Sequence, residues 1–307
     1  MFINYRMSFL SSDSAGVSIR EPSTANFLVD ADDRLETVFP SPAKFTINQK
    51  QSLFNGFFTR MAVQEINMNW AVPNISAQLG NNTLSWYNYG TPGTIYTVTV
   101  PDGNYTVSLL LSILSTAMTA VGGTWTVAGP TTTVPCATLN KSGVTGVVFL
   151  AGTATTSGAP SLQAMLNLTT ATGVAGYLQF FIQAPCLQPF SYIDFVCNDL
   201  TYNQSLKDGS TNSIVPNRDV LYRWYFAWDE APTRDSYNYP ILQGYEPFNQ
   251  RRCIAFPKQI KWQPNMPLGQ LTFQIYDAYN NNLTYLNTFG NGIQAMTFRM
   301  SLLVSEV

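Results

Sequence analysis

Two groups of carboxylates are the first candidates for chemistry in this chain. The run from Asp30 to Asp33 (Asp-Ala-Asp-Asp) offers the oxygen ligands that calcium prefers, but it lacks the glycine and the terminal glutamate of an EF-hand loop. We therefore expect a solvated acidic turn there. Asp229 and Glu230 are adjacent, and adjacent residues of a strand point to opposite faces, so they cannot share an acid/base site.

Histidine is absent from all 307 residues. Its absence removes the commonest general acid/base near neutral pH and the commonest metal ligand, which excludes Ser-His-Asp and Cys-His catalysis and most zinc sites. The four cysteines form no C-x-x-C pair, and we expect them to be buried free thiols: Cys136, Cys186, Cys197 and Cys253. We predict a protein with no enzymatic activity, no cofactor and no bound metal. A β-sandwich hydrolase that uses only carboxylates remains an alternative.

Basic residues gather at Arg251 and Arg252, with Lys258 and Lys261 close behind. Such a group can grip phosphate or the carboxylates of a neighbouring subunit; at this low density we favour a solvated or subunit-pairing patch. The whole chain carries 16 basic and 18 acidic residues, a formal net charge of −2. That balance provides no general field for nucleic acid or an anionic membrane, so we expect no specific nucleic-acid partner.

Charge is almost missing from the middle of the chain. Between Asp102 and Asp194 the only charged residue is Lys141, in a segment rich in Thr, Gly, Ala, Ser and Leu. The cores of protein interfaces are depleted of charge in this way, so we predict that the segment lies against other protein. The alternative is a polar, uncharged loop region. The candidate interface residues here are Thr132, Lys141 and Thr155.

Short strand-like segments separated by turn residues, with little helix, predict an all-β fold, an antiparallel β-sandwich or barrel. One helix is expected over Thr106–Val121, capped by Asn104 or Thr106 and stopped by Gly122-Gly123, and a short one over Ser161–Leu168. Strands are expected at Lys44–Asn48, Met61–Trp70, Thr83–Tyr87, Ile95–Val100, Thr124–Ala128, Val144–Ala151, Tyr177–Gln183, Tyr192–Asn198, Val220–Trp228, Cys253–Phe256, Gln259–Trp262, Gln270–Asp277 and Met296–Val304.

Residues 1–43 have no clear hydrophobic period and end at Pro40 and Pro42, which predicts an extended N-terminal arm before one domain over residues 44–307. Charges, tyrosines and prolines concentrate in residues 199–252, which we expect to be loop-rich and exposed. The longest apolar stretch is too short and too rich in Ser and Thr to span a bilayer, so no transmembrane contact is expected. The first residues lack the pattern of a secretory signal, which favours synthesis in the cell interior.

Several stretches resemble a known family. The order Phe-Thr-Ile, Met-Ala-Val-Gln-Glu-Ile-Asn-Met-Asn-Trp and Asn-Asn-Thr-Leu-Ser-Trp within residues 45–86, then Tyr-Thr-Val-Thr-Val-Pro-Asp-Gly-Asn-Tyr-Thr at 96–106, is similar to the single jelly-roll minor capsid proteins, or pentons, of virophages, polinton-like viruses and related large DNA viruses. Residues 192–200, residues 267–277 and the last apolar strand are similar too. The likeness spans most of residues 44–307.

This resemblance implies a jelly-roll sandwich that forms a homopentamer at each five-fold vertex of an icosahedral capsid. Its implied partners are a double jelly-roll major capsid protein and other minor capsid proteins, and its implied location is the virion after synthesis inside the host cell. A glycan-binding β-sandwich, such as a fibre head or lectin-like attachment protein, is the alternative. Exposed aromatic residues within 199–252 would favour it, because aromatic rings stack on sugars.

Overall fold

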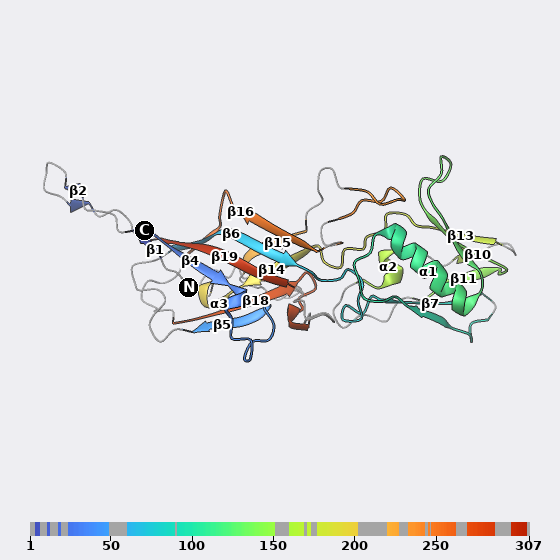
Figure 1. Ribbon diagram of the computed structural model, residues 1–307, viewed down its shortest axis with the longest axis horizontal. Coiled ribbons are helices and arrows are strands. Elements are labelled where there is room, and N and C mark those ends of the chain that lie inside the picture. Colours follow the sequence, from blue (N-terminus) through green and yellow to red (C-terminus); the bar gives the residue numbers. More distant parts are fainter. Residues whose placement is uncertain are drawn as a thin grey trace, which may run out of the picture. The chain divides into compact units, whose positions relative to one another are not determined.

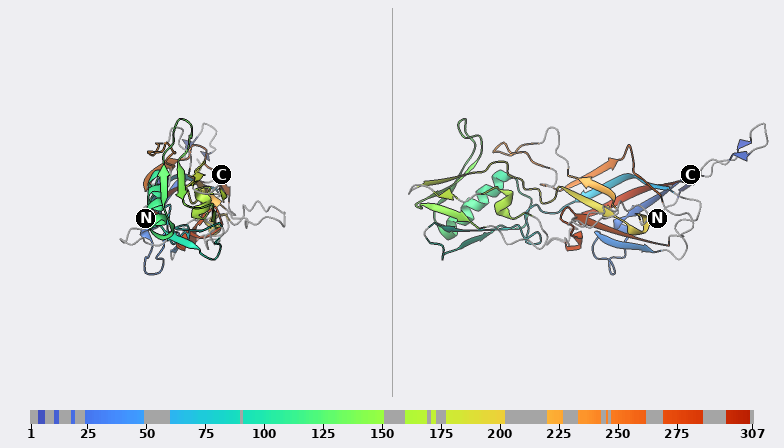
Figure 2. Two further views of the ribbon diagram at one scale, coloured as in Figure 1. Left: turned by 90° about the vertical axis from the view of Figure 1, so that its right-hand side faces the viewer. Right: turned by 180° about the vertical axis from the view of Figure 1, so that it is seen from behind.

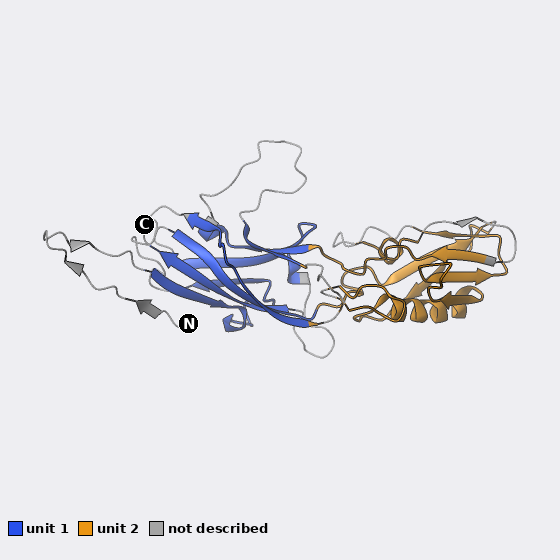
Figure 3. Ribbon diagram, turned by 90° about the horizontal axis from the view of Figure 1, so that it is seen from above, with its two compact units in different colours: residues 1–71, 192–225, 248–307 blue, residues 72–191, 226–247 orange. Residues whose placement is uncertain are grey.

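Two compact units make up the chain in the computed structural model (Figure 3). Unit 1 comprises Met1–Ala71, Tyr192–Tyr225 and Phe248–Val307, and unit 2 comprises Val72–Ser191 and Phe226–Pro247. The structure describes residues 4–6, 11–12, 18–19, 24–48, 60–89, 91–150, 160–168, 171–172, 177–201, 220–226, 233–242, 245, 247–261, 269–285 and 296–305. Residues 44–307, expected to form one domain, are thus shared between two compact units, and unit 2 has a core of its own.

Unit 1 is an antiparallel sandwich of two sheets (Figure 1). The first sheet has the order β4 (Thr24–Asp30), β19 (Met296–Ser305), β6 (Arg60–Trp70) and β16 (Phe248–Cys253); β1 (Asn4–Arg6) extends it at β4, and β17 (Gln259–Lys261) pairs with β6. The second has the order β15 (Val220–Tyr225), β14 (Tyr192–Val196), β18 (Gln270–Asp277) and β5 (Lys44–Asn48).

The connectivity of these strands is that of a jelly roll. We number the strands one to eight in chain order and leave β1 and β17 aside. The first sheet then has the order one-eight-three-six, and the second has the order two-seven-four-five. Successive strands therefore alternate between the sheets, apart from the adjacent pair β14 and β15, as in a double Greek key. The predicted all-β jelly-roll fold class is confirmed for unit 1.

Aromatic side chains from both sheets meet in the interior of unit 1. Phe298 of β19 lies 5.9 Å from Phe45 of β5 and 5.0 Å from Phe195 of β14, measured between ring centroids. Along β6, Ile66, Met68 and Trp70 are buried and face this core, so the intervening residues face outward. Period-two alternation thus gives each sheet one apolar inner face and one polar outer face.

Unit 2 is inserted into unit 1 twice, at one end of the sandwich. The first insertion leaves after β6 and returns at β14, and the second leaves after β15 and returns at β16. Trp70, where the first insertion leaves, pairs with Phe248, where the second returns, and Tyr192, where the first returns, pairs with Tyr225, where the second leaves. The ring of Trp224, next to Tyr225, stacks on Phe248 at 6.5 Å, which brings these junctions to the same end.

Two small sheets and two helices form unit 2. One sheet has the order β13 (Tyr177–Phe181), β10 (Thr138–Ser142) and β9 (Trp125–Ala128); the other has β12 (Ala171–Thr172), β11 (Gly146–Phe149), β7 (Thr83–Asn88) and β8 (Tyr96–Thr99). Helix α1 (Val107–Gly122) lies against β8 and β9, and Figure 2 shows it from behind. Helix α2 (Leu162–Met165) lies within Ser161–Leu168, where a short helix was expected.

Helix α1 follows its sequence signals closely. Thr106 caps its first turn, where the hydroxyl accepts a hydrogen bond from the Leu109 amide at 3.4 Å. The helix stops before Gly123, whose φ of 95° suits a residue without a side chain. Its apolar stripe faces a core in which Trp86 meets Trp125 edge-on at 5.6 Å. The buried residues of the stripe are Val107, Leu110, Leu111, Leu114 and Met118.

The predicted N-terminal arm includes a core strand. β4 pairs with β19 over seven residue pairs, from Asp30 with Arg299 to Thr24 with Ser305, and Phe27 and Val29 are buried. Residues 24–30 of the predicted arm are thus an integral strand of the first sheet. The remaining short elements of unit 1 are β2 (Ser11–Ser12), β3 (Ser18–Ile19), η1 (Ala31–Asp33), α3 (Asn198–Thr201) and η2 (Leu283–Tyr285).

Candidate assembly surfaces

Lys141, a predicted interface residue, points into unit 2. It is only 1% exposed, its ammonium group donates a hydrogen bond to the Gly122 carbonyl, and it lies 4.6 Å from the centroid of the Trp125 ring. Burial lowers the pKa of this amine. Because Gly122 is the last residue of α1, the ammonium group stabilises the carbonyl end of the helix. The side chain predicted to contact a neighbouring subunit is thus enclosed by its own unit.

An acidic residue, Asp235, binds the other end of α1. The Asp235 carboxylate accepts hydrogen bonds from the Ser108 amide at 2.8 Å and from the amides of Tyr237 and Tyr239, both at 2.9 Å. A carboxylate at a helix N-terminus complements the helix dipole. Asp235 thereby fixes the second insertion of the chain to a helix formed by the first.

Tyrosine hydroxyls fix the same insertion further along. Tyr239 donates to the Ile182 carbonyl at 2.6 Å and accepts from the Ala137 amide at 2.9 Å, while Tyr245 accepts from the Leu187 amide at 2.8 Å. Burial raises the pKa of Tyr239 to about 12. Residues 199–252 were predicted to be loop-rich and exposed, and their described part is mixed: Thr233 and Arg234 are exposed, whereas Leu221 and Trp224 are buried. Strand β15 and Tyr245 belong to packed cores, and Lys207 lies outside the described residues.

Arg251 and Arg252 do not form one patch, because adjacent residues of β16 point to opposite sides. Arg251 lies on the outer face of the first sheet and pairs with Glu65 at 2.6 Å. Arg252 lies on the other side, with its guanidinium carbon 3.9 Å from the centroid of the Trp224 ring. Of the remaining interface candidates, Thr132 is exposed in unit 2, and Thr155 lies outside the described residues.

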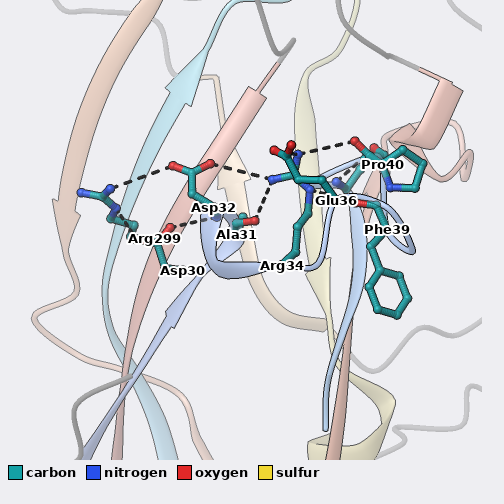
Figure 4. Close-up of polar contacts among 10 residues, drawn as sticks. Asp30, Ala31, Asp32, Arg34, Glu36, Phe39, Pro40 and Arg299 are labelled. Atoms are coloured by element: carbon teal, nitrogen blue, oxygen red, sulfur yellow. Dashed lines mark hydrogen bonds and ion pairs between the residues drawn. The ribbon is translucent and has the colours of Figure 1, made fainter.

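The acidic run at residues 30–33 is paired with arginines (Figure 4). Arg34, whose side chain is 1% exposed, donates to the carbonyls of Ala31 at 2.8 Å and Phe39 at 3.0 Å and to Glu36 at 3.2 Å. Arg299 pairs with Asp30 at 2.6 Å. Asp32 and Asp33 are exposed, in agreement with the expected solvated acidic turn, and the buried guanidinium group of Arg34 holds the connection between β4 and β5. No group of metal-ligating side chains occurs in the described part of the chain.

A polar hollow of about 170 Å³ lies on the outer face of the first sheet. Asn69 of β6 pairs across the sheet with Asn249 of β16 and with Thr297 of β19, which sets their side chains side by side. The carboxamides of these two asparagines make no hydrogen bond with another described side chain. The hollow is lined by Asp32, Asn67, Asn69, Asn249, Thr297, Phe298 and Arg299.

The outer face of the second sheet carries tyrosines around a paired arginine. Arg223 binds both carboxylate oxygens of Asp194, at 2.6 and 2.8 Å, and this hydrogen bonding raises its pKa. Its guanidinium carbon lies 3.9 Å from the centroid of the Tyr192 ring, and Tyr192 meets Tyr225 at 5.9 Å. Tyr225 is 54% exposed. We call Tyr192, Arg223 and Tyr225 the tyrosine face; these residue types are enriched at interface hot spots.

Arg251, on the outer face of the first sheet, was a predicted contact residue, but the asparagines of the hollow and Tyr225 were not. Tyr225 lies within residues 199–252, where exposed aromatic residues were expected to favour glycan binding, and alternation with buried Trp224 would have predicted its outward direction. The asparagines alternate with the buried residues of β6 in the same way. Their grouping depends on strand pairing between residues far apart in the chain, which carries no local signal.

Among the solved structures similar to this chain are a mavirus penton protein and a chain of the Sputnik virophage. The mavirus penton protein, in its SeMet-labelled crystal structure, shares 11% identity, covers 94% of this chain and 100% of its own, and has a TM-score of 0.46. The cryo-EM structure of the Sputnik virophage at 3.5 Å resolution contains a chain that shares 12% identity, covers 99% of this chain and 97% of its own, and has a TM-score of 0.40. No family model and no curated protein matches the sequence.

No helix in the described ranges combines the length and the hydropathy that crossing a bilayer requires.

Proposed function

We propose that this chain is a structural virion protein, the penton of an icosahedral capsid, and that five copies form a ring at each five-fold vertex. The observation that carries the proposal is the jelly-roll strand order of unit 1, β4-β19-β6-β16 against β15-β14-β18-β5. Viral capsid proteins are among the main users of this architecture. The sequence resemblance to virophage-type minor capsid proteins supports the same function.

The position of the insertions supports a vertex subunit. Both begin and end at one end of the sandwich, so neither insertion interrupts a strand of the two sheets of unit 1. In a ring, the outer faces of these sheets contact neighbouring copies, and unit 2 adds a second folded body to each subunit. Because fold alone does not establish function, the proposal needs a test in particles.

The remaining partner assignments follow from the same proposal. A double jelly-roll major capsid protein surrounds the vertex, and other minor capsid proteins contact the penton. Thr132, exposed in unit 2, remains a proposed contact residue. Thr132→Asp should then block incorporation while leaving the melting temperature unchanged, because an unpaired charge in a dry contact is costly.

Imaging of particles tests the proposal. A particle preparation that contains this chain with an affinity tag is labelled with gold and viewed by electron microscopy. Label at the five-fold vertices supports the penton assignment. Label confined to three-fold positions, or particles that exclude the chain, would contradict it.

Glycan binding is the second candidate, and the exposed Tyr225 is the observation that favours it. An exposed ring beside an arginine can stack on a sugar and hydrogen bond with its hydroxyls. A glycan array probed with the full chain and with Tyr225→Ala tests this candidate. Binding that is lost in the variant would support an attachment protein, and an array without binding would reject it.

A further inference from the structure

We propose that the two outer faces of unit 1 bind each other between neighbouring copies, with Tyr225 of one copy inserted into the polar hollow of the next. The hollow is centred on Asn69, Asn249 and Thr297 of the first sheet, and the tyrosine face belongs to the second. This inference rests on the proposed ring assembly and identifies the contact that closes it.

The sandwich itself places the two surfaces correctly for a ring. Phe298 and Phe195 fill the space between the sheets, so the hollow and the tyrosine face point away from each other on opposite sides of one unit. A cyclic assembly joins one patch of each subunit to a different patch of the next, and such patches must lie on different sides. A twofold dimer would instead need a single patch that matches itself.

The size of the hollow favours a side chain over a free ligand. Its volume of about 170 Å³ is below the ~300–1,000 Å³ of typical small-molecule pockets. A tyrosine ring with its hydroxyl is an occupant of suitable size and polarity. The carboxamides of Asn69 and Asn249 offer both N–H donors and carbonyl acceptors, so they can satisfy a phenolic hydroxyl in either role.

Charges on both surfaces are already paired within their own subunit. On the tyrosine face Arg223 is held by Asp194, and beside the hollow Arg299 is held by Asp30. Contact between the faces therefore buries no unpaired ion, which would oppose assembly. The ion pair with Asp194 and the ring of Tyr192 also order the tyrosine face before binding, so less conformational entropy is lost on assembly.

Cysteine cross-linking in the full chain tests the contact. The exposed native thiols are first removed with Cys186→Ser and Cys253→Ser, and the pair Tyr225→Cys with Asn249→Cys is then added. Mild oxidation should link neighbouring copies into a ladder that ends at the ring. The matched control, Tyr225→Cys with Phe256→Cys, uses a 96% exposed partner elsewhere in unit 1 and should not form the ladder. Ladders of equal yield from both pairs would overturn the inference.

Affinity measurements separate the two proposals. Tyr225→Ala should weaken self-association by ~30-fold or more, as truncation of a hot-spot residue does, and Tyr225→Phe by about 2- to 10-fold through loss of one hydrogen bond. Asn69→Ala combined with Tyr225→Phe should weaken it by less than the product of the single effects. Rings that persist unchanged in Tyr225→Ala would overturn this inference and leave the penton proposal standing. A wild-type chain that stays monomeric and binds a glycan through Tyr225 would overturn both.

Discussion

The two units of this chain reach a packed core with very different use of charge. Unit 1 places ion pairs on its surfaces: Arg223 with Asp194, Arg251 with Glu65 and Arg299 with Asp30. In the first segment of unit 2, residues 72–191, only Asp102 and Lys141 are charged. Lys141 is buried at the end of α1, and Asp235 from the second segment binds the start of that helix.

The comparison teaches that a charge-poor sequence has two separate explanations. One is a surface that contacts other protein; the other is a domain whose interior takes up its apolar residues. Unit 2 satisfies the second, because its own core buries Trp86, Trp125, Phe149 and Phe180. The first explanation then applies only to the outer residues of unit 2, such as Thr132, whose low charge suits an assembly surface.

Deletion of residues 1–43 should have the largest effect on unit 1. It removes β4, which fills a position in the first sheet between β19 and β1 and buries Phe27 and Val29. Hydrogen exchange measured by mass spectrometry should show loss of protection throughout unit 1 and less change in β7 and α1 of unit 2. Deletion of residues 1–20 is the control and should keep both units protected. Full protection of unit 1 without residues 1–43 would mean that β4 is dispensable.

Phe298→Ala is the next strongest change, again directed at unit 1. The ring contacts Phe45 and Phe195 of the facing sheet, so its loss leaves a cavity and should lower the free energy of unfolding of unit 1 by about 3–5 kcal/mol. Urea denaturation followed by tryptophan fluorescence measures the change. Phe256→Ala, at a residue 96% exposed, should alter stability by no more than about 0.5 kcal/mol. Similar costs for both variants would contradict the sandwich core described above.

Asp235→Ala should destabilise unit 2 by about 1–3 kcal/mol, because three backbone amides lose their acceptor and the start of α1 loses its carboxylate. Faster hydrogen exchange at Ser108 and in the first turn of the helix would report it. Asp235→Asn keeps one acceptor oxygen and should cost less. Asp33→Ala, at an exposed acidic residue of unit 1, serves as the control for loss of charge alone.

Lys141→Met should have the smallest effect, visible as a change in pH dependence. Burial lowers the pKa of Lys141 below its ordinary 10.5, so between the lowered value and 10.5 the unfolded chain binds more protons than the folded chain. Raising the pH through that window should increase the stability of the wild type relative to Lys141→Met. Urea denaturation at several pH values gives the free energy of unfolding of both proteins. Subtracting one from the other removes the contribution of tyrosine ionisation, which both proteins share. A pH-independent difference would contradict the burial of this amine.

Local patterns predicted much of unit 1 and the helix of unit 2. Period-two alternation identified β6, β18 and β19, and the cap and glycine signals bounded α1. Strands without such alternation were missed or misplaced. β10 buries Thr138, Asn140 and Lys141 on both of its sides, and β16 is a polar edge strand, so neither has an apolar face to read from the sequence.

Sequence patterns could not predict the division into two units, and the reason is different. Each insertion is delimited by pairing between strand ends that are far apart in the chain, such as Trp70 with Phe248. The charge-poor segment between Asp102 and Asp194 ends close to Tyr192, but low charge alone does not distinguish an inserted unit from a contact surface. The assembly surfaces depend on the same long-range pairing, because Asn69 and Asn249 become neighbours only when β6 and β16 pair.

The mass of the assembled full chain tests the central claim most directly. Native mass spectrometry of the purified protein, repeated over a range of concentrations, counts the subunits without reference to particles. The account predicts a closed species at five times the 34.0 kDa chain mass, with little tetramer or hexamer. A stable trimer, or a monomer at every concentration, would contradict it.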